Sequence, residues 1–270
     1  MESISFGIIK GMILFLFVLG LVVGSFLNVV GLRWGTGQTL LGRSHCPSCN
    51  KILKWWELVP IVSFFVLKAR CRECQVKISW QYPTVEILTG LVFATIFNLQ
   101  FSILQNLLFL TIFCIYIVIV IYDIRHKIIP DELVYVAIFL SLLIPLFFVS
   151  YATLDWLSGP ILFAFFGLIW LFSRGRAMGF GDAKLGLSVG FLLGASQGFS
   201  AIILAFWIGA FVSLLYIFLN KTGLLTGKAG FLKNAEKLTM KSEIPFAPFI
   251  VAGAWMSLVF HLNIFYVALF

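Results

Sequence analysis

Charged residues are scarce in this chain. Asp, Glu, Lys and Arg make up 11% of its 270 residues, and hydrophobic residues make up 61%. An ordinary soluble domain carries roughly 25% charged residues, so this composition excludes a water-soluble globular protein. Apolar runs of eighteen or more residues recur along the sequence. They predict an all-α polytopic membrane protein.

The first apolar run lacks the marks of a secretory signal. Residues 11–32 follow Lys10 without a charge, but no small-residue cleavage site ends the run and further apolar runs follow. We therefore expect a first transmembrane helix. Gly20 and Gly24 within it have the spacing of glycines that allow close helix packing.

Eight membrane spans are predicted, because a helix crosses the bilayer in about 20 residues. Residues 83–122 are too many for one span, and a polar cluster around Asn98 and Asn106 divides them into two. Residues 183–219 are also too many, and the turn at 194–198 leaves a short span and a full one. The other spans are expected at 11–32, 132–150, 156–173 and 244–268.

Basic residues fall on one side of this topology. Residues 31–82 hold eight Lys or Arg, residues 220–243 hold five lysines, and only Lys10 lies on the other side. The positive-inside rule places this side in the cytoplasm and both termini in the periplasm. The formal charge of +8 then reports topology, with anionic membrane lipids as a partner and nucleic acid excluded.

The same topology divides the chain into five parts. They are a first transmembrane helix (1–32), a cytoplasmic four-cysteine loop (33–82), a membrane core (83–219), a basic cytoplasmic loop (220–243) and a last transmembrane helix (244–270).

Four of the five cysteines form two Cys-x-x-Cys pairs. Twenty-one residues separate the pair Cys46 and Cys49 from the pair Cys71 and Cys74, and a tryptophan follows each pair at the same distance. Two such turns can present four thiolates in a tetrahedron, which predicts a structural zinc site in the loop. A reduced loop without metal and a redox pair are the alternatives, and His45 could replace a ligand. Cytosolic thiols are rarely held as stable disulfides.

Two aspartates are expected at the cytoplasmic face. Asp123 closes the third span. Asp182 opens the sixth span, and Gly179 and Gly181 come shortly before it. Two neighbouring carboxylates that share a proton are what aspartyl proteolysis requires. The two glycines would admit a substrate backbone.

Simpler roles compete with catalysis at these positions. Asp182 could cap a helix, Asp123 could pair with Arg125 or Lys127, and we expect Asp131, after Pro130, to begin a helix.

Six elements in this order resemble the bacterial type IV prepilin peptidases: "GSFLNVVGLR", "CPSC", "CREC", "YPTVEILTG", "DIRHKIIPD" and "GFGDAKL". The resemblance covers about residues 20–220. It implies an intramembrane aspartyl endopeptidase of the bacterial inner membrane, with Asp123 and Asp182 as the catalytic pair. Its implied substrates are type IV prepilins or type II secretion pseudopilins, whose leader peptides are cut on the cytoplasmic side.

The resemblance also implies a second activity. Many members of the family methylate the new N-terminus with S-adenosylmethionine, and the zinc loop, here Cys46, Cys49, Cys71 and Cys74, is associated with those members. The sequence holds no Rossmann-type glycine fingerprint, so the residues that bind S-adenosylmethionine are unassigned. Asn28 and Glu86 fall in matching stretches without a role, and a structural polar contact is favoured for Glu86.

Two non-enzymatic functions remain as alternatives. A transporter would use membrane carboxylates as proton or cation sites, with the broken sixth span as a binding feature, but it predicts carboxylates nearer the middle of the membrane. A zinc-stabilised scaffold of a secretion machine predicts that neither Asp123 nor Asp182 matters for processing. The substrate set and the oligomeric state are not encoded in any recognisable pattern.

Overall fold

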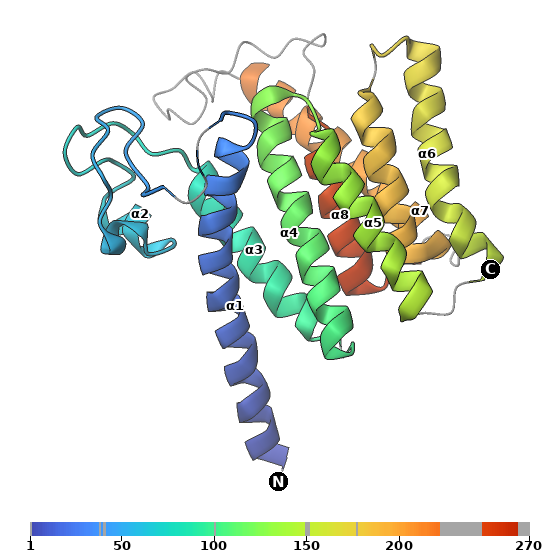
Figure 1. Ribbon diagram of the computed structural model, residues 1–270, viewed down its shortest axis with the longest axis horizontal. Coiled ribbons are helices and arrows are strands. Elements are labelled where there is room, and N and C mark those ends of the chain that lie inside the picture. The colour runs from blue at the N-terminus through green and yellow to red at the C-terminus, as the bar shows by residue number, and fades with distance from the viewer. Residues whose placement is uncertain are drawn as a thin grey trace. The chain divides into compact units, whose positions relative to one another are not determined.

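The computed structural model describes residues 2–37, 39, 42–99, 101–148, 152–176, 178–221 and 245–263. The chain forms two compact units, residues 1–121 and 122–270, and each is described by itself. In the described part of the chain the regular elements are helices, accompanied by two isolated β-bridges in the cysteine loop. Figure 1 shows the helices in chain order from blue to red.

The first unit contains α1 (Glu2–Arg33), the 3-10 helix η1 (Trp55–Leu58), α2 (Val62–Val66), α3 (Gln81–Phe97) and α4 (Ile103–His126) up to Ile121. Helices α1 and α3 pack along each other. A Cβ on Gly20 would lie 2.7 Å from Gly90 Cα, and one on Gly24 would lie 2.8 Å from Thr89 Oγ1. These contacts confirm that the two glycines allow a close helix crossing.

The polar residues near position 100 separate two helices, as predicted. Helix α3 ends at Phe97 and α4 begins at Ile103. The hydroxyl of Ser102 accepts a hydrogen bond from the Gln105 N–H at 3.3 Å, and the Asn106 amide donates to Phe101 O at 3.1 Å. Side chains thus satisfy backbone groups where the helix starts.

The second unit contains the end of α4, then α5 (Asp131–Phe147), α6 (Thr153–Ser173), α7 (Phe180–Lys221) and α8 (Ala247–Phe260). Helix α7 is its centre, because it packs against α5, α6 and α8. A Cβ on Gly190 would lie 2.5 Å from Gly159 Cα, so glycines on both sides let α6 and α7 approach closely.

Helix α7 is broken at Gly194, where the backbone has φ 73° and ψ −172°. The Asp155 carboxylate accepts a hydrogen bond from the N–H of the next residue, Ala195, at 2.9 Å. A Cβ on Gly198 would lie 3.5 Å from Gly190 Cα, although eight residues of continuous helix would separate them by about 12 Å. The chain therefore folds back within the predicted turn at 194–198.

Helix α8 is shorter than the span predicted at 244–268. It ends at Phe260, because His261 takes a left-handed conformation and the Leu262 N–H then bonds to Ser257 O at 3.1 Å. Residues 264–270 lie outside the described residues. So does the basic loop predicted at 220–243, apart from the last residues of α7.

Four helices of the described part are long and apolar enough to cross a membrane: Lys10–Arg33, Ile103–His126, Thr153–Ser173 and Phe180–Leu219. Helix α8 is apolar but shorter. The structure therefore confirms the predicted fold class, an all-helical protein with helices able to span a membrane. The count of eight spans stays a prediction.

Candidate functional site

Asp123 lies in the last turn of α4. Its carbonyl accepts the Lys127 N–H at 2.8 Å, and Lys127 leaves the helix with φ 54°. The side chain is 4% exposed, and one carboxylate oxygen accepts a hydrogen bond from the Ala247 N–H at the start of α8. The other oxygen, Oδ2, is buried and has no hydrogen-bond partner within the described part of the chain. The ion pairs of the described residues do not join Asp123 to Arg125 or Lys127.

Asp182 lies in the first turn of α7 and is 6% exposed. The helix begins at Phe180, so Asp182 is not the capping residue itself. Its carboxylate reaches back to accept the N–H of Gly179, the residue before the helix, as the acidic residue of a capping box does. Asp182 therefore does take part in capping the helix, although from the third helical position and not as the capping residue. It also makes a second contact.

That second contact is Asp123. The two carboxylates, from the end of α4 and the start of α7, are close enough to interact electrostatically. Both belong to the second unit, and 59 residues of sequence separate them. A charged group is costly to bury without a partner, so two buried carboxylates side by side are a functional feature to explain.

The two glycines before Asp182 differ in their surroundings. A Cβ on Gly181 would lie 2.7 Å from Ile129 Cβ, so Gly181 is required by packing against the segment that leads into α5. A Cβ on Gly179 would lie 3.6 Å from Asp182 Oδ2, which is an ordinary contact. Substrate-backbone access stays a prediction for both positions.

Sequence reasoning did not single out Lys184. Its ammonium pairs with Asp131 at 2.7 Å and lies over the rings of Tyr135 and Phe180 at 5.1 and 5.3 Å. Asp131 begins α5, as predicted, and through this pair it also joins α5 to α7 one turn from Asp182. Its position two residues after Asp182 was the only feature of the sequence that could have pointed to Lys184.

Ala247 was also missed. It is fully buried, begins α8 and supplies the N–H that holds one oxygen of Asp123. An alanine followed by proline carries no recognisable chemistry, because its contribution comes from the backbone alone.

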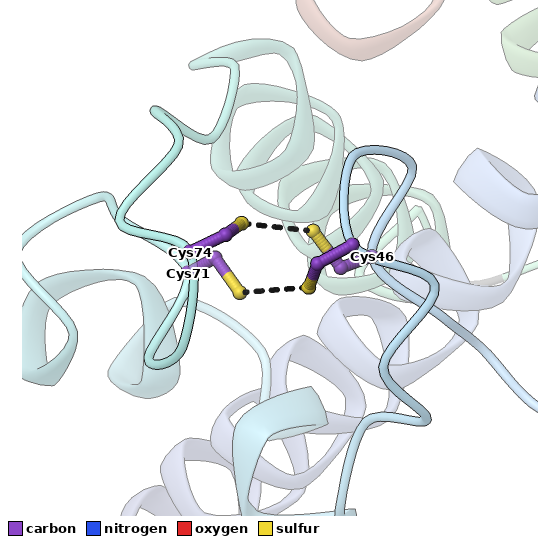
Figure 2. Close-up of side chains that lie close together, drawn as sticks. Cys46, Cys71 and Cys74 are labelled. Carbon is purple, nitrogen blue, oxygen red and sulfur yellow. Dashed lines mark hydrogen bonds between the residues drawn. The ribbon is translucent and has the colours of Figure 1, made fainter.

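The four cysteines of the loop form one cluster. Their sulfur atoms all lie within 4.8 Å of one another. Cys46 Sγ is 3.7 Å from Cys74 Sγ, and Cys49 Sγ is 4.0 Å from Cys71 Sγ. Figure 2 shows the sulfur of Cys46 facing those of Cys71 and Cys74 across the cluster. Zn–S bonds of about 2.3 Å in a tetrahedron separate neighbouring sulfurs by about 3.8 Å. The donor set and its spacing therefore fit zinc.

The two halves of the cluster repeat the same backbone structure at an offset of 25 residues. The Asn50 N–H donates to Cys46 O at 2.9 Å, and the Gln75 N–H donates to Cys71 O at 3.1 Å. Asn50 and Gln75 both have φ 55°. An antiparallel bridge closes each turn. The duplication indicated by the tryptophan spacing is thus present in the fold.

Backbone N–H groups favour the thiolate form of Cys46, whereas the pKa of Cys49, next to the other sulfurs, is raised to about 11. Burial opposes ionisation of the Cys46 thiol, but the N–H groups of Cys49 and Ser48 outweigh it and lower the pKa to about 7. Nearby, the Lys54 N–H and then the Lys51 ammonium hold the pKa of buried Glu57 below its usual range. Lys51 also pairs with Glu73 at 3.2 Å and so links the two halves of the loop.

Asn28 and Glu86 hold structural contacts in the first unit. The Asn28 amide donates to Gly24 O within α1 and to Tyr82 O in α3, at 3.2 and 3.3 Å. The Glu86 carboxylate accepts the Ile61 N–H at 2.8 Å. The sequence positions of Asn28 and Glu86 did not predict these hydrogen-bond partners.

The fold and these residues define a helical membrane protein with a buried pair of carboxylates and a separate four-thiol module. The sequence model of the bacterial peptidase A24 N-terminal domain matches residues 18–100, and that of the type IV leader peptidase family matches residues 108–214. The chain belongs to the type IV leader peptidase family and is a peptidase of that family.

Relatives support this membership over most of the chain. A prepilin leader peptidase/N-methyltransferase of Bacillus subtilis is 30% identical over 252 residues, 90% of this chain and 92% of that protein. One from Stutzerimonas stutzeri is 29% identical and covers 89% and 88%. One from Myxococcus xanthus is 56% identical over 80 residues, 29% of this chain and 24% of that protein. No solved structure matches the chain significantly.

Proposed function

We propose that this peptidase is an intramembrane aspartyl endopeptidase that removes leader peptides from type IV prepilins or type II secretion pseudopilins. The observation that carries the mechanism is the buried pair of Asp123 and Asp182, which come from helices far apart in the sequence and interact electrostatically. The names of the relatives, prepilin leader peptidases/N-methyltransferases, support prepilins as the substrate class.

The mechanism requires one ionised and one protonated carboxylate. The ionised group takes a proton from water, whose oxygen attacks the scissile carbonyl carbon. The protonated group donates a hydrogen bond to the carbonyl oxygen. When the C–N bond breaks, the leaving amine takes up a proton. The Ala247 N–H supports this arrangement, because it holds one oxygen of Asp123 while Oδ2 has no hydrogen-bond partner among the described residues.

The pair is proposed to work at the cytoplasmic face of the inner membrane, with both termini in the periplasm. The distribution of Lys and Arg supports this orientation. The break at Gly194 supports the count of eight spans, because it divides α7 into two helices. A prepilin would then lie with its apolar helix in the bilayer and its basic leader at the carboxylates.

The cysteine cluster is proposed to hold a structural zinc ion through Cys46, Cys49, Cys71 and Cys74. Four thiolate ligands leave no open position on the metal, so the ion would fold the loop and take no part in cleavage. The sulfur separations support this ligand set.

A second reaction is proposed at the product. The new N-terminal amine would take a methyl group from the sulfonium of S-adenosylmethionine, which leaves as S-adenosylhomocysteine with loss of a proton from the amine. The names of the relatives support this activity. Transfer of labelled methyl from S-adenosylmethionine to cleaved substrate tests it directly. Cleaved substrate that stays unlabelled would contradict it.

Leader removal by purified protein in detergent tests the peptidase mechanism. Asp123→Asn and Asp182→Asn should each lower the cleavage rate about 10²–10⁴-fold, since each removes an acid or base from the reaction. Asp131→Asn is the matched control, because Asp131 is an exposed carboxylate on the next helix. Wild-type cleavage by either catalytic variant would exclude the mechanism.

A further inference from the structure

The four-thiol module exposes a large apolar surface. We call it the aromatic face, made by η1, α2 and the residue before α3: Trp55, Trp56, Val62, Phe65, Val66 and Trp80. Their exposed fractions lie between 42% and 75%. Phe65 and Trp80 are in contact, with ring centroids 6.3 Å apart, and Trp55 meets Trp56 at 5.5 Å. Exposed apolar side chains gathered on neighbouring elements mark a place of interaction.

The start of α2, in the aromatic face, lies beside α1 and α3 rather than beyond their ends. Glu86 of α3 accepts the Ile61 N–H at the start of α2 at 2.8 Å, and it also hydrogen-bonds Ser25 of α1. Ser25 is eight residues before the end of α1, which is about 12 Å along the helix axis. Figure 1 shows α2 at the level of the upper part of α1, where α3 begins. All these elements belong to the first unit.

This depth explains the buried carboxylate of Glu86. Ile61 has φ 61°, outside helical conformation. Non-helical backbone at membrane depth is tolerated where protein groups satisfy its N–H and C=O groups, because lipid cannot. Glu86 supplies such an acceptor from within α3. A module held entirely in water would not need it, since water would satisfy the Ile61 N–H.

The charge around the aromatic face favours an anionic lipid surface as its binding partner. The predicted loop region 31–82 carries eight Lys or Arg and two acidic residues, Glu57 and Glu73, and both acids already pair with Lys51. Lys54 lies over the Trp56 ring at 4.9 Å. Tryptophan next to basic residues is typical of the membrane interface, where the basic groups meet anionic headgroups.

We propose that the aromatic face is a membrane anchor of the four-thiol module, embedded in the interfacial region of an anionic leaflet. Phe65 and Val66 of α2 lie among the acyl chains. Trp55, Trp56 and Trp80 lie at the headgroup level, and Glu86 holds the start of α2 at this depth. The module is thus fixed at both its ends by spans and in its middle by lipid. This inference does not depend on the cleavage reaction.

Photo-crosslinking in lipid nanodiscs tests the anchor. The full-length protein with p-benzoylphenylalanine at position 65 is reconstituted in phosphatidylcholine and phosphatidylglycerol and irradiated, and the peptide that spans α2 is searched for lipid adducts by mass spectrometry. Position 73, between Cys71 and Cys74 on the thiol side of the module, carries the same group in the matched control. Unchanged zinc content in both variants shows that the module is folded.

The anchor predicts lipid adducts at position 65 and several-fold fewer at position 73. Equal yields at both positions, or none at position 65, would overturn the proposal. A repeat of the experiment with a prepilin present tests whether the aromatic face binds substrate instead of lipid. If the adducts at position 65 shift from lipid to the substrate helix, this face is a substrate-docking surface and the lipid anchor is contradicted.

Discussion

The carboxylate pair and the four-thiol module bring acidic groups together in opposite ways. Asp123 and Asp182 lie 59 residues apart on two helices, and one carboxylate oxygen of Asp123 finds no hydrogen-bond partner among the residues that the structure describes. The four thiols come from two local turns, and backbone N–H groups favour ionisation of one of them, Cys46. Two buried carboxylates side by side destabilise the fold unless they share a proton, whereas four thiolates would be partly neutralised by a bound metal ion. The comparison separates the proposed catalytic site from the proposed structural one.

Removing thiols should have the largest structural effect. Cys46→Ser combined with Cys71→Ser removes one ligand from each half, so the zinc content should fall from one ion per chain to near zero. The module should then become sensitive to trypsin, because metal binding supplies apparent folding free energy of about 10–16 kcal/mol in small zinc units.

Cys114→Ser is the matched control, since Cys114 lies in α4 and outside the cluster. Metal analysis and limited proteolysis give the readout. Full zinc content in the double cysteine variant would refute the ligand set. Loss of zinc in the Cys114 variant would refute the separation between module and helix.

Gly181→Ala should be the next most harmful change. Its Cβ would clash with Ile129, and overpacking of this kind typically costs about 1–3 kcal/mol. We expect a lower melting temperature in detergent, together with slower leader removal, because the start of α7 positions Asp182.

Gly179→Ala is the comparison, because its Cβ finds ordinary contact distances. It should leave the melting temperature unchanged. If Gly179→Ala nevertheless raises KM, the cause lies in substrate access, as the sequence predicted. If both variants melt like the wild type, the packing role of Gly181 is wrong.

Lys184→Met should have the smallest effect. It removes the ion pair with Asp131, which is more than half exposed, and exposed ion pairs contribute roughly 0–1 kcal/mol. A double-mutant cycle with Asp131→Asn, measured by thermal unfolding, should give a coupling energy in that range. A coupling energy well above it would mean that the pair holds α5 and α7 together far more strongly than its exposure indicates.

Local spacing explains why the sequence was informative about the cysteines. Each Cys-x-x-Cys turn fixes its own geometry, so four positions and one loop length predicted the cluster. The break near Asn98 and the turn near Gly194 were also predictable, because apolar runs longer than a membrane span must be interrupted.

The carboxylate environment could not be predicted in the same way. The pairing of Asp123 with Asp182 required a topology argument and a family resemblance. Ala247 contributes only a backbone N–H, and the Glu86 carboxylate meets an N–H 25 positions earlier. Such contacts depend on tertiary packing, which leaves no periodic signal. The end of α8 at Phe260 depended likewise on the left-handed conformation of His261.

The most direct test measures cleavage and zinc content on the same preparations of Asp182→Asn and of the Cys46→Ser, Cys71→Ser double variant. We predict that Asp182→Asn keeps its zinc and loses leader removal, while the double cysteine variant loses zinc and retains detectable leader removal. Leader removal by Asp182→Asn at the wild-type rate, with its zinc still bound, would contradict the assignment of catalysis to the aspartates.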